Sequence, residues 1–253
     1  TLHNLNNVNT KELEKQLDYI ADDKPMELIL PCLFSELESD ALKNILNKIN
    51  KVNFLQHIII GLDKANQEQF NFAKKYFSSL NASHSILWND GPRLQKLQKE
   101  LNQKELANVE DGKGKNVWYC IGFAIARNSA EAVVFHDCDI KTYDESILIK
   151  LLYPLLNESM GYSFSKGYYS RYADNKLNGR VTRLLVTPLV KSLMKLFGNN
   201  DYLDFIDAFR YPLAGEYAIK KNLLKEIRIP SDWGLEIGIL SELQRNNSNK
   251  LCC

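Results

Sequence analysis

Apolar residues along the first half of the chain follow two alternating patterns. Short continuous apolar runs at 26–30, 58–60, 85–88 and 132–135 are typical of buried strands. Between them, apolar residues recur every three or four positions, as on one face of a helix, at 10–21, 39–49, 66–77, 95–106 and 116–126. Strands that alternate with helices predict a mostly parallel sheet with helices on its faces and right-handed crossovers.

The second half continues the pattern less regularly. It predicts a helix at 145–156, an aromatic strand within 161–169, a polar loop at 171–178 and a long amphipathic helix at 181–197. We see no internal repeat and no low-complexity linker. We therefore expect one α/β domain over 1–253.

Composition narrows the function classes. The 253 residues are 45% hydrophobic and 25% charged, with a net charge of +1, so no electrostatic footprint favours nucleic acid or an anionic membrane. No apolar stretch has the length of a membrane span, and the polar start is unlike a signal peptide, so we expect a cytoplasmic protein. The five cysteines are odd in number and mostly isolated, which argues against a disulfide framework or zinc-finger spacing. The chain starts without Met and stops at Cys252-Cys253, so we expect a fragment of a longer protein.

Asp137 and Asp139 follow the apolar run 132–135 and bracket Cys138. Residues two apart on a strand point to the same face. Both carboxylates would then project where an α/β sheet binds ligands, beyond the carboxyl ends of its strands. Paired carboxylates suit a hard cation, Mg²⁺ or Mn²⁺, that can hold a diphosphate. The alternative is that two Asp residues open a surface loop.

Three other segments have positions in the sequence that suit ligand binding. Lys113 lies between Gly112 and Gly114 just before a predicted helix, which suits a phosphate or is a flexible turn with a solvated lysine. Residues 178–182 also enter a helix, with an arginine and a threonine that suit a small anion or simply cap the helix. Glu236 stands among apolar residues, so it is either paired structurally or placed for ligand hydroxyl groups.

These segments, in this order, resemble the glucosyl-3-phosphoglycerate synthase family of retaining glycosyltransferases, which includes mannosyl relatives. The resemblance spans roughly 26–243, and the most specific stretches are 112–114, 137–140, 166–171, 179–182, 212–218 and 233–238. It implies a GT-A fold with a nucleotide-sugar-binding half at about 24–160 and an acceptor-binding half at about 161–243. It also implies transfer of a hexose from UDP-glucose, or GDP-mannose, to 3-phosphoglycerate with retention, with Mg²⁺ or Mn²⁺ as cofactor, by a homodimer.

The resemblance assigns roles to matching positions. It places Pro31, Leu33, Glu36 and Lys113 beside the nucleotide and diphosphate, and Asp137 and Asp139 at the metal and ribose, with Asp139 the more direct ligand. It places Glu236 at the donor sugar, and Leu213 and Gly215 beside the reacting centre. The acceptor set that it implies is Arg171, Gly179, Arg180, Val181 and Thr182.

The chain departs from the family pattern on the nucleotide side and in its metal ligands. Phe34-Ser35-Glu36 stands where the family often has Asn-Glu-Glu, and the second strand ends in Gly61-Leu62-Asp63-Lys64 rather than an Asp-rich turn. The family's histidine ligand has no counterpart here, because all four histidines lie upstream, so we expect it beyond Cys253. His136 adjoins the Asp pair but is expected in the core or behind the ligands.

Two alternatives to hexose transfer onto 3-phosphoglycerate remain open. One is a GT-A transferase that uses another acceptor, such as glycerate, and the other is a catalytically silent nucleotide-sugar-binding domain. For the dimer we consider the region after Gly198, where Tyr202, Phe205 and Phe209 provide either apolar surface or core.

Overall fold

The computed structural model describes residues 9–106, 111–168, 172–173, 176–177, 179–198, 200–246 and 252–253. The strands are β1 (Met26–Leu33), β2 (Leu55–Asp63), β3 (His84–Trp88), β4 (Ala132–Phe135), β5 (Phe164–Lys166), β6 (Tyr172–Ala173), β7 (Lys176–Leu177) and β8 (Tyr217–Lys220). The helices are α1 (Thr10–Ile20), α2 (Asp40–Ile49), α3 (Gln67–Phe77), α4 (Pro92–Gln103), α5 (Lys113–Arg127), α6 (Glu145–Leu156), α7 (Thr187–Phe197), α8 (Asp201–Asp207), α9 (Lys221–Leu224) and α10 (Leu235–Asn246). A 3₁₀ turn, η2 (Phe34–Glu38), and a π-helical stretch, η3 (Thr182–Val186), complete the described elements.

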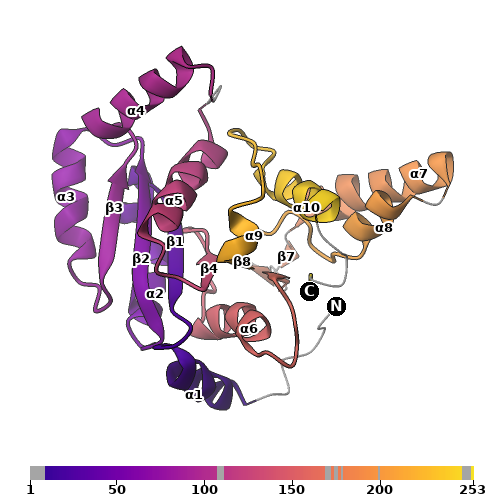
Figure 1. Cartoon of the computed structure of the whole chain (residues 1–253), viewed down its shortest axis with the longest axis horizontal. Helices are drawn as coiled ribbons and strands as arrows, with labels where there is room; N and C mark the ends of the chain where they lie inside the picture. The colour runs from indigo at the N-terminus through magenta and orange to yellow at the C-terminus, as the bar shows by residue number, and fades with distance from the viewer. Residues whose placement is uncertain are drawn as a thin grey trace.

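Six strands form one mixed sheet in the order β3-β2-β1-β4-β8-β5 (Figure 1). The neighbours from β3 to β4 are parallel, and β8 runs antiparallel to both β4 and β5. This confirms the mostly parallel α/β sheet predicted from the alternating pattern. The short β8 was not predicted, because its four residues carry no distinctive period and its partners lie far away in sequence.

The two faces of the sheet support two apolar layers. Leu28 and Leu30 face a layer that includes buried residues of α1, α2, α3 and α6. Ile29 and Val133 face the other layer, with α5, α8 and α10. Alternate residues of β1 thus pack on opposite faces, and its near-continuous apolar sequence is that of a strand buried on both sides. The Asp pair follows the carboxyl end of β4, at the edge of the sheet.

Side-chain caps fix the starts of several helices. Ser39 caps α2 by accepting a hydrogen bond from the Leu42 N–H, and Asn66 and Gln69 form a capping box at α3. The predicted helices at 10–21, 39–49, 66–77 and 145–156 are confirmed within a residue or two. No helix in the described ranges combines the length and the apolar character needed to cross a bilayer.

Two expectations need adjustment, and one open alternative is decided. The helix expected from residue 116 begins at Lys113, so the glycine–lysine segment is the helix start itself. The polar loop expected at 171–178 contains the hairpin strands β6 and β7, and its other residues lie outside the described chain. Of the aromatics after Gly198, Phe205 is buried and packs edge-to-face on Phe209, which confirms the core alternative.

Candidate active site

The carboxyl ends of β1 and β4 meet at the centre of the sheet. The chain moves outward from β1 to β2 and β3 on one side and places β4 on the other. Ligands of open α/β sheets bind at such a switch in strand order. Residues 34–36 follow β1 and residues 136–139 follow β4, so the topology brings two predicted segments to one edge.

Lys113 lies between two carboxylates at this edge. Its Nζ is 2.7 Å from Asp137 Oδ1 and 2.9 Å from Glu236 Oε1. The three side chains come from the start of α5, the loop after β4 and the first turn of α10, and each is largely shielded from solvent. The structure thus brings together three predicted site residues that span 113–236 in the sequence. The alternatives for Glu236 are resolved in part, since it is paired with Lys113.

The charge of Lys113 is fixed by these neighbours. Burial alone would lower the pKa of Lys113, but Asp137 and Glu236 outweigh it and hold that pKa well above its usual value. An ammonium with two carboxylates keeps its proton throughout the physiological pH range.

Close backbone packing positions Lys113. A Cβ on Gly114 would lie 2.1 Å from the Pro230 carbonyl oxygen, so only glycine allows this approach. The N–H groups of Gly114 and Lys115 donate to the carbonyls of Asp232 and Ser231. These two helix-start amides are therefore already used within the protein. Of the features expected to bind a phosphate here, these two amides are engaged within the protein and the Lys113 side chain is paired with Asp137 and Glu236.

Asp137 lies directly over Gly215. A Cβ on Gly215 would meet Asp137 Oδ2 at 2.2 Å, so the carboxylate occupies the space that any larger residue would need. Asp139 is exposed and lies in a turn beyond the end of β4, where strand alternation no longer applies. The argument that placed both carboxylates on one strand face is therefore wrong in its geometry.

Glu36 links the two strand ends. Its Oε2 accepts a hydrogen bond of 2.8 Å from the Leu33 N–H. Burial raises the pKa of Glu36, the Leu33 N–H lowers it, and the charges of Asp139 and Asp137 raise it further. Both carboxylates of the Asp pair thus act on Glu36, and the three acidic groups share one region. Pro31 lies half-buried at the end of β1, and Leu33 is exposed.

Lys166 is a second cation at this site, and sequence reasoning missed it. Its Nζ donates a 2.7 Å hydrogen bond to the Ala214 carbonyl and lies 5.5 Å from the centre of the Tyr217 ring. Burial lowers the pKa of Lys166 to about 8, although Glu236 and Glu216 act to raise it. The family-like stretch 166–171 contained the signal, but no rule of spacing singled out its first residue.

The expected acceptor residues begin the helix that leads into η3. Gly179 has a φ of +84°, which favours glycine, and Arg180 and Val181 are exposed. Thr182 is buried, and its Oγ1 has no hydrogen-bond partner among the described residues. Leu213 lies half-buried in a turn. Among the described residues, no hydrogen bond or ion pair joins 179–182 to Lys113 or Asp137, and Arg171 lies outside the described chain.

Two buried groups beside the Asp pair belong to the core. His136 is fully buried, its Nδ1 lies 2.8 Å from the Tyr143 hydroxyl, and burial lowers its pKa to about 3. This confirms the core interpretation of His136. A hydrogen bond with Cys32 and burial raise the pKa of Cys138 well above its usual value.

The six-stranded mixed sheet with helices on both faces has the GT-A fold. The chain superposes on Mycobacterium tuberculosis glucosyl-3-phosphoglycerate synthase in complex with Mn²⁺, UDP and glucosyl-3-phosphoglycerate, with a TM-score of 0.68 at 21% identity, covering 95% of this chain and 72% of that one. A complex of the same protein with Mn²⁺, UDP-glucose and phosphoglyceric acid also gives 0.68, at 22% identity, covering 94% and 72%.

Sequence comparison gives the particular relatives. The chain is 40% identical over its whole length to the glucosyl-3-phosphoglycerate synthase of Persephonella marina, and 38% identical over 97% of its length to that of Methanococcoides burtonii. The resemblance inferred from the motifs is thereby confirmed. The chain spans 62% and 61% of the lengths of these two relatives. No protein-family model matches the chain.

Replacing Gly215 tests the packing beneath Asp137. We expect Gly215→Ala to push the carboxylate away from Lys113 and to lower the free energy of unfolding by about 1–3 kcal/mol. Gly122→Ala is the matched control, because a Cβ there meets nothing within 4 Å and an alanine within α5 should be neutral or stabilising by up to about 1 kcal/mol. Urea unfolding measures both, and equal stabilities for the two variants would contradict the packing described.

The pKa of Lys166 predicts a pH dependence of stability. Because the native pKa of about 8 lies below the unfolded value of 10.5, the unfolded chain binds more protons between these pH values. The free energy of unfolding of the wild type, relative to Lys166→Met, should therefore rise from pH 8 to pH 10.5. Urea unfolding of both proteins across this range measures the difference. A constant difference would show that Lys166 has an ordinary pKa.

Proposed function

We propose that the protein transfers a hexose from a nucleotide sugar to 3-phosphoglycerate with retention of anomeric configuration, with UDP-glucose as the first donor to test. The observation that carries the proposal is Lys113 between Asp137 and Glu236 at the carboxyl ends of β1 and β4. Relatives with 40% and 38% identity that are named for this reaction support it.

The Asp pair fits a hard divalent cation. Asp139 is exposed and makes no hydrogen bond or ion pair within the described chain, and Asp137 adds a second carboxylate. Mg²⁺ is commonly held by one or two carboxylates together with phosphate oxygens and water, so two protein ligands suffice. Mg²⁺ or Mn²⁺, when bound, would neutralise the charge of the diphosphate. The structural neighbours from M. tuberculosis include complexes with each of these cations and UDP.

The chain's own cations and carboxylates have distinct roles in this proposal. Lys113 stabilises the departing diphosphate, since its charge persists at all relevant pH values. Lys166 adds a second positive charge nearby. Glu236 accepts a hydrogen bond from a hydroxyl of the donor sugar while it stays paired with Lys113. The backbone at Leu213 and Gly215 borders the reacting centre.

The helix start at 179–182 binds the acceptor. Arg180 has an exposed guanidinium at the first turn, where anions are favoured by free backbone N–H groups. The buried Thr182 hydroxyl adds a hydrogen-bonding group. A phosphate is the anion that such a set suits best. With donor and acceptor held side by side, positioning alone supplies much of the rate, and the acceptor hydroxyl attacks from the face that the diphosphate leaves.

Release of nucleoside diphosphate tests the function. We expect the complete protein, with Mg²⁺, to release UDP from UDP-glucose faster with 3-phosphoglycerate than with water alone. GDP-mannose and glycerate complete the panel of donors and acceptors. In Arg180→Ala the KM for 3-phosphoglycerate should rise at least tenfold, as for the loss of a charged hydrogen bond, with less change for the donor. Donor binding without release under every combination would support a silent binding domain instead.

We also propose that the protein is a homodimer. Leu185, Leu189 and Leu196 are each at least half exposed and recur at the spacing of one helix face along η3 and α7. Figure 1 shows α7 extending away from the sheet. An apolar helix face of this kind suits a second copy in a closed symmetric pair.

Sedimentation velocity of the complete protein tests the dimer. We expect Leu185→Glu with Leu189→Glu to convert a dimer into a monomer, because each charge would be buried in the interface. Tyr19→Glu, on the exposed side of α1, is the control and should leave the dimer intact. A wild-type monomer at micromolar concentration would exclude the proposal.

A further inference from the structure

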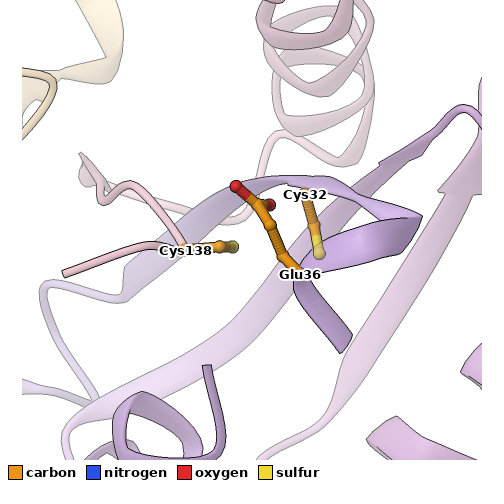
Figure 2. Close-up of side chains that lie close together, drawn as sticks. All are labelled: Cys32, Glu36 and Cys138. Atoms are coloured by element: carbon orange, nitrogen blue, oxygen red, sulfur yellow. The ribbon is translucent and has the colours of Figure 1, made fainter. Parts of the chain in front are cut away.

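A second group of metal-ligating side chains lies beside the Asp pair. Figure 2 shows Cys32, Glu36 and Cys138 coming together from the end of β1, from η2 and from the loop after β4. The two sulfur atoms and one carboxylate oxygen all lie within 4.8 Å of one another. Within the parts of the chain that the structure describes, no other three side chains from His, Cys, Asp and Glu bring their ligand atoms this close together.

The fold holds the two thiols in fixed positions. β1 pairs in parallel with β4, with Ile29 opposite Phe135. Cys32 lies three residues beyond Ile29 on β1, and Cys138 lies three residues beyond Phe135 in the loop after β4. Both cysteines are about 1% exposed and belong to the apolar layer that contains Leu28 and Leu30. The pairing of β1 with β4 and burial in one layer therefore hold the two thiols close together.

Glu36 completes the set from the solvent side. Its half-buried carboxylate is oriented by the 2.8 Å hydrogen bond that Oε2 accepts from the Leu33 N–H. Hydrogen bonds of this kind orient the ligands of metal sites. The carboxylate also hydrogen-bonds with the Cys32 thiol, so it lies against one of the two sulfur donors.

The chemistry of these donors differs from that of the Asp pair. Two thiolates and one carboxylate select a soft or borderline cation, whereas carboxylates alone suit Mg²⁺ or Mn²⁺. Tetrahedral zinc, with bonds of about 2.3 Å to sulfur and 2.0–2.2 Å to oxygen, places its ligand atoms about 3.5–3.8 Å apart. The three donors need to close by no more than about one ångström to reach that spacing.

We propose that Cys32, Cys138 and Glu36 form a Zn²⁺ site, with water as the fourth ligand. A disulfide between Cys32 and Cys138 would leave the Glu36 carboxylate without a role, whereas a cation uses it as the third ligand. Because Cys138 stands between Asp137 and Asp139, Zn²⁺ held by its thiolate also restrains the two carboxylates. Zn²⁺ bound there would lie immediately behind the cation that the proposed function assigns to the Asp pair.

Cadmium and zinc titrations of the full chain test this site. The background is the Cys252→Ser, Cys253→Ser variant under reducing conditions, so that the half-buried terminal thiols do not compete. We expect one Cd²⁺ per chain, seen as thiolate-to-metal charge-transfer absorption, and displacement of Cd²⁺ by Zn²⁺ but not by excess Mg²⁺. Added Cys32→Ser or Cys138→Ser should abolish this absorption, while Cys120→Ser, at a buried thiol elsewhere, should leave it unchanged.

Glu36→Gln separates the metal site from the two thiols. Its amide oxygen can still accept from the Leu33 N–H, so the local turn is kept, but the negative ligand is lost. We expect the affinity for Zn²⁺, measured against a chromophoric chelator, to fall at least tenfold, because even the loss of a residue that only supports a ligand costs that much. Binding of one Zn²⁺ with unchanged affinity in the Cys32→Ser, Cys138→Ser variant would overturn the proposal, as would no binding in the background. Circular dichroism of each variant confirms that the fold is kept.

Discussion

The ion pairs of Lys113 hold the centre of the structure together. The lysine extends from the first residue of α5 and contacts the loop after β4 and the first turn of α10 through two short ion pairs. Removing either carboxylate would leave the other to balance the charge alone. A largely buried lysine without partners is costly, so the positions of these three elements depend on one another.

Glycine makes this convergence sterically possible. Gly114 lets α5 approach residues 230–231, which lead into α10, and Gly215 leaves room for the Asp137 carboxylate. Ala214, the neighbour of Gly215, accepts a hydrogen bond from Lys166 with its carbonyl. Adjacent residues therefore hold Lys166 and leave room for Asp137. Charge and backbone packing are thus set by the same short stretches, which lie far apart in the sequence.

Two kinds of donor set meet at the end of β4. Asp137 faces Lys113 and Gly215, while Cys138 packs into the opposite apolar layer with Cys32. The neighbouring residues Asp137 and Cys138 thus point to opposite sides of the sheet edge. Glu36 interacts with both sets, because the charges of Asp137 and Asp139 act on it and the two thiols lie beside it.

Local pattern predicted the sheet, most helices and the position of the Asp pair, because β-branched runs and helical spacing are properties of short segments. It identified Lys113 and Glu236 but not their contact, which depends on tertiary packing over more than 100 residues. Lys166 and the group of Cys32, Glu36 and Cys138 were missed for the same reason. The argument that both carboxylates lie on one face of a strand was wrong, because β4 ends at Phe135 and strand alternation does not extend into a turn.

The central claim is that Lys113 and Asp137 form a strong, partly buried pair. A double-mutant cycle of urea unfolding with Lys113→Met, Asp137→Asn and the double variant measures their coupling directly. We predict a coupling free energy above about 1 kcal/mol, beyond the range of exposed ion pairs. Additive effects, with a coupling near zero, would contradict the account.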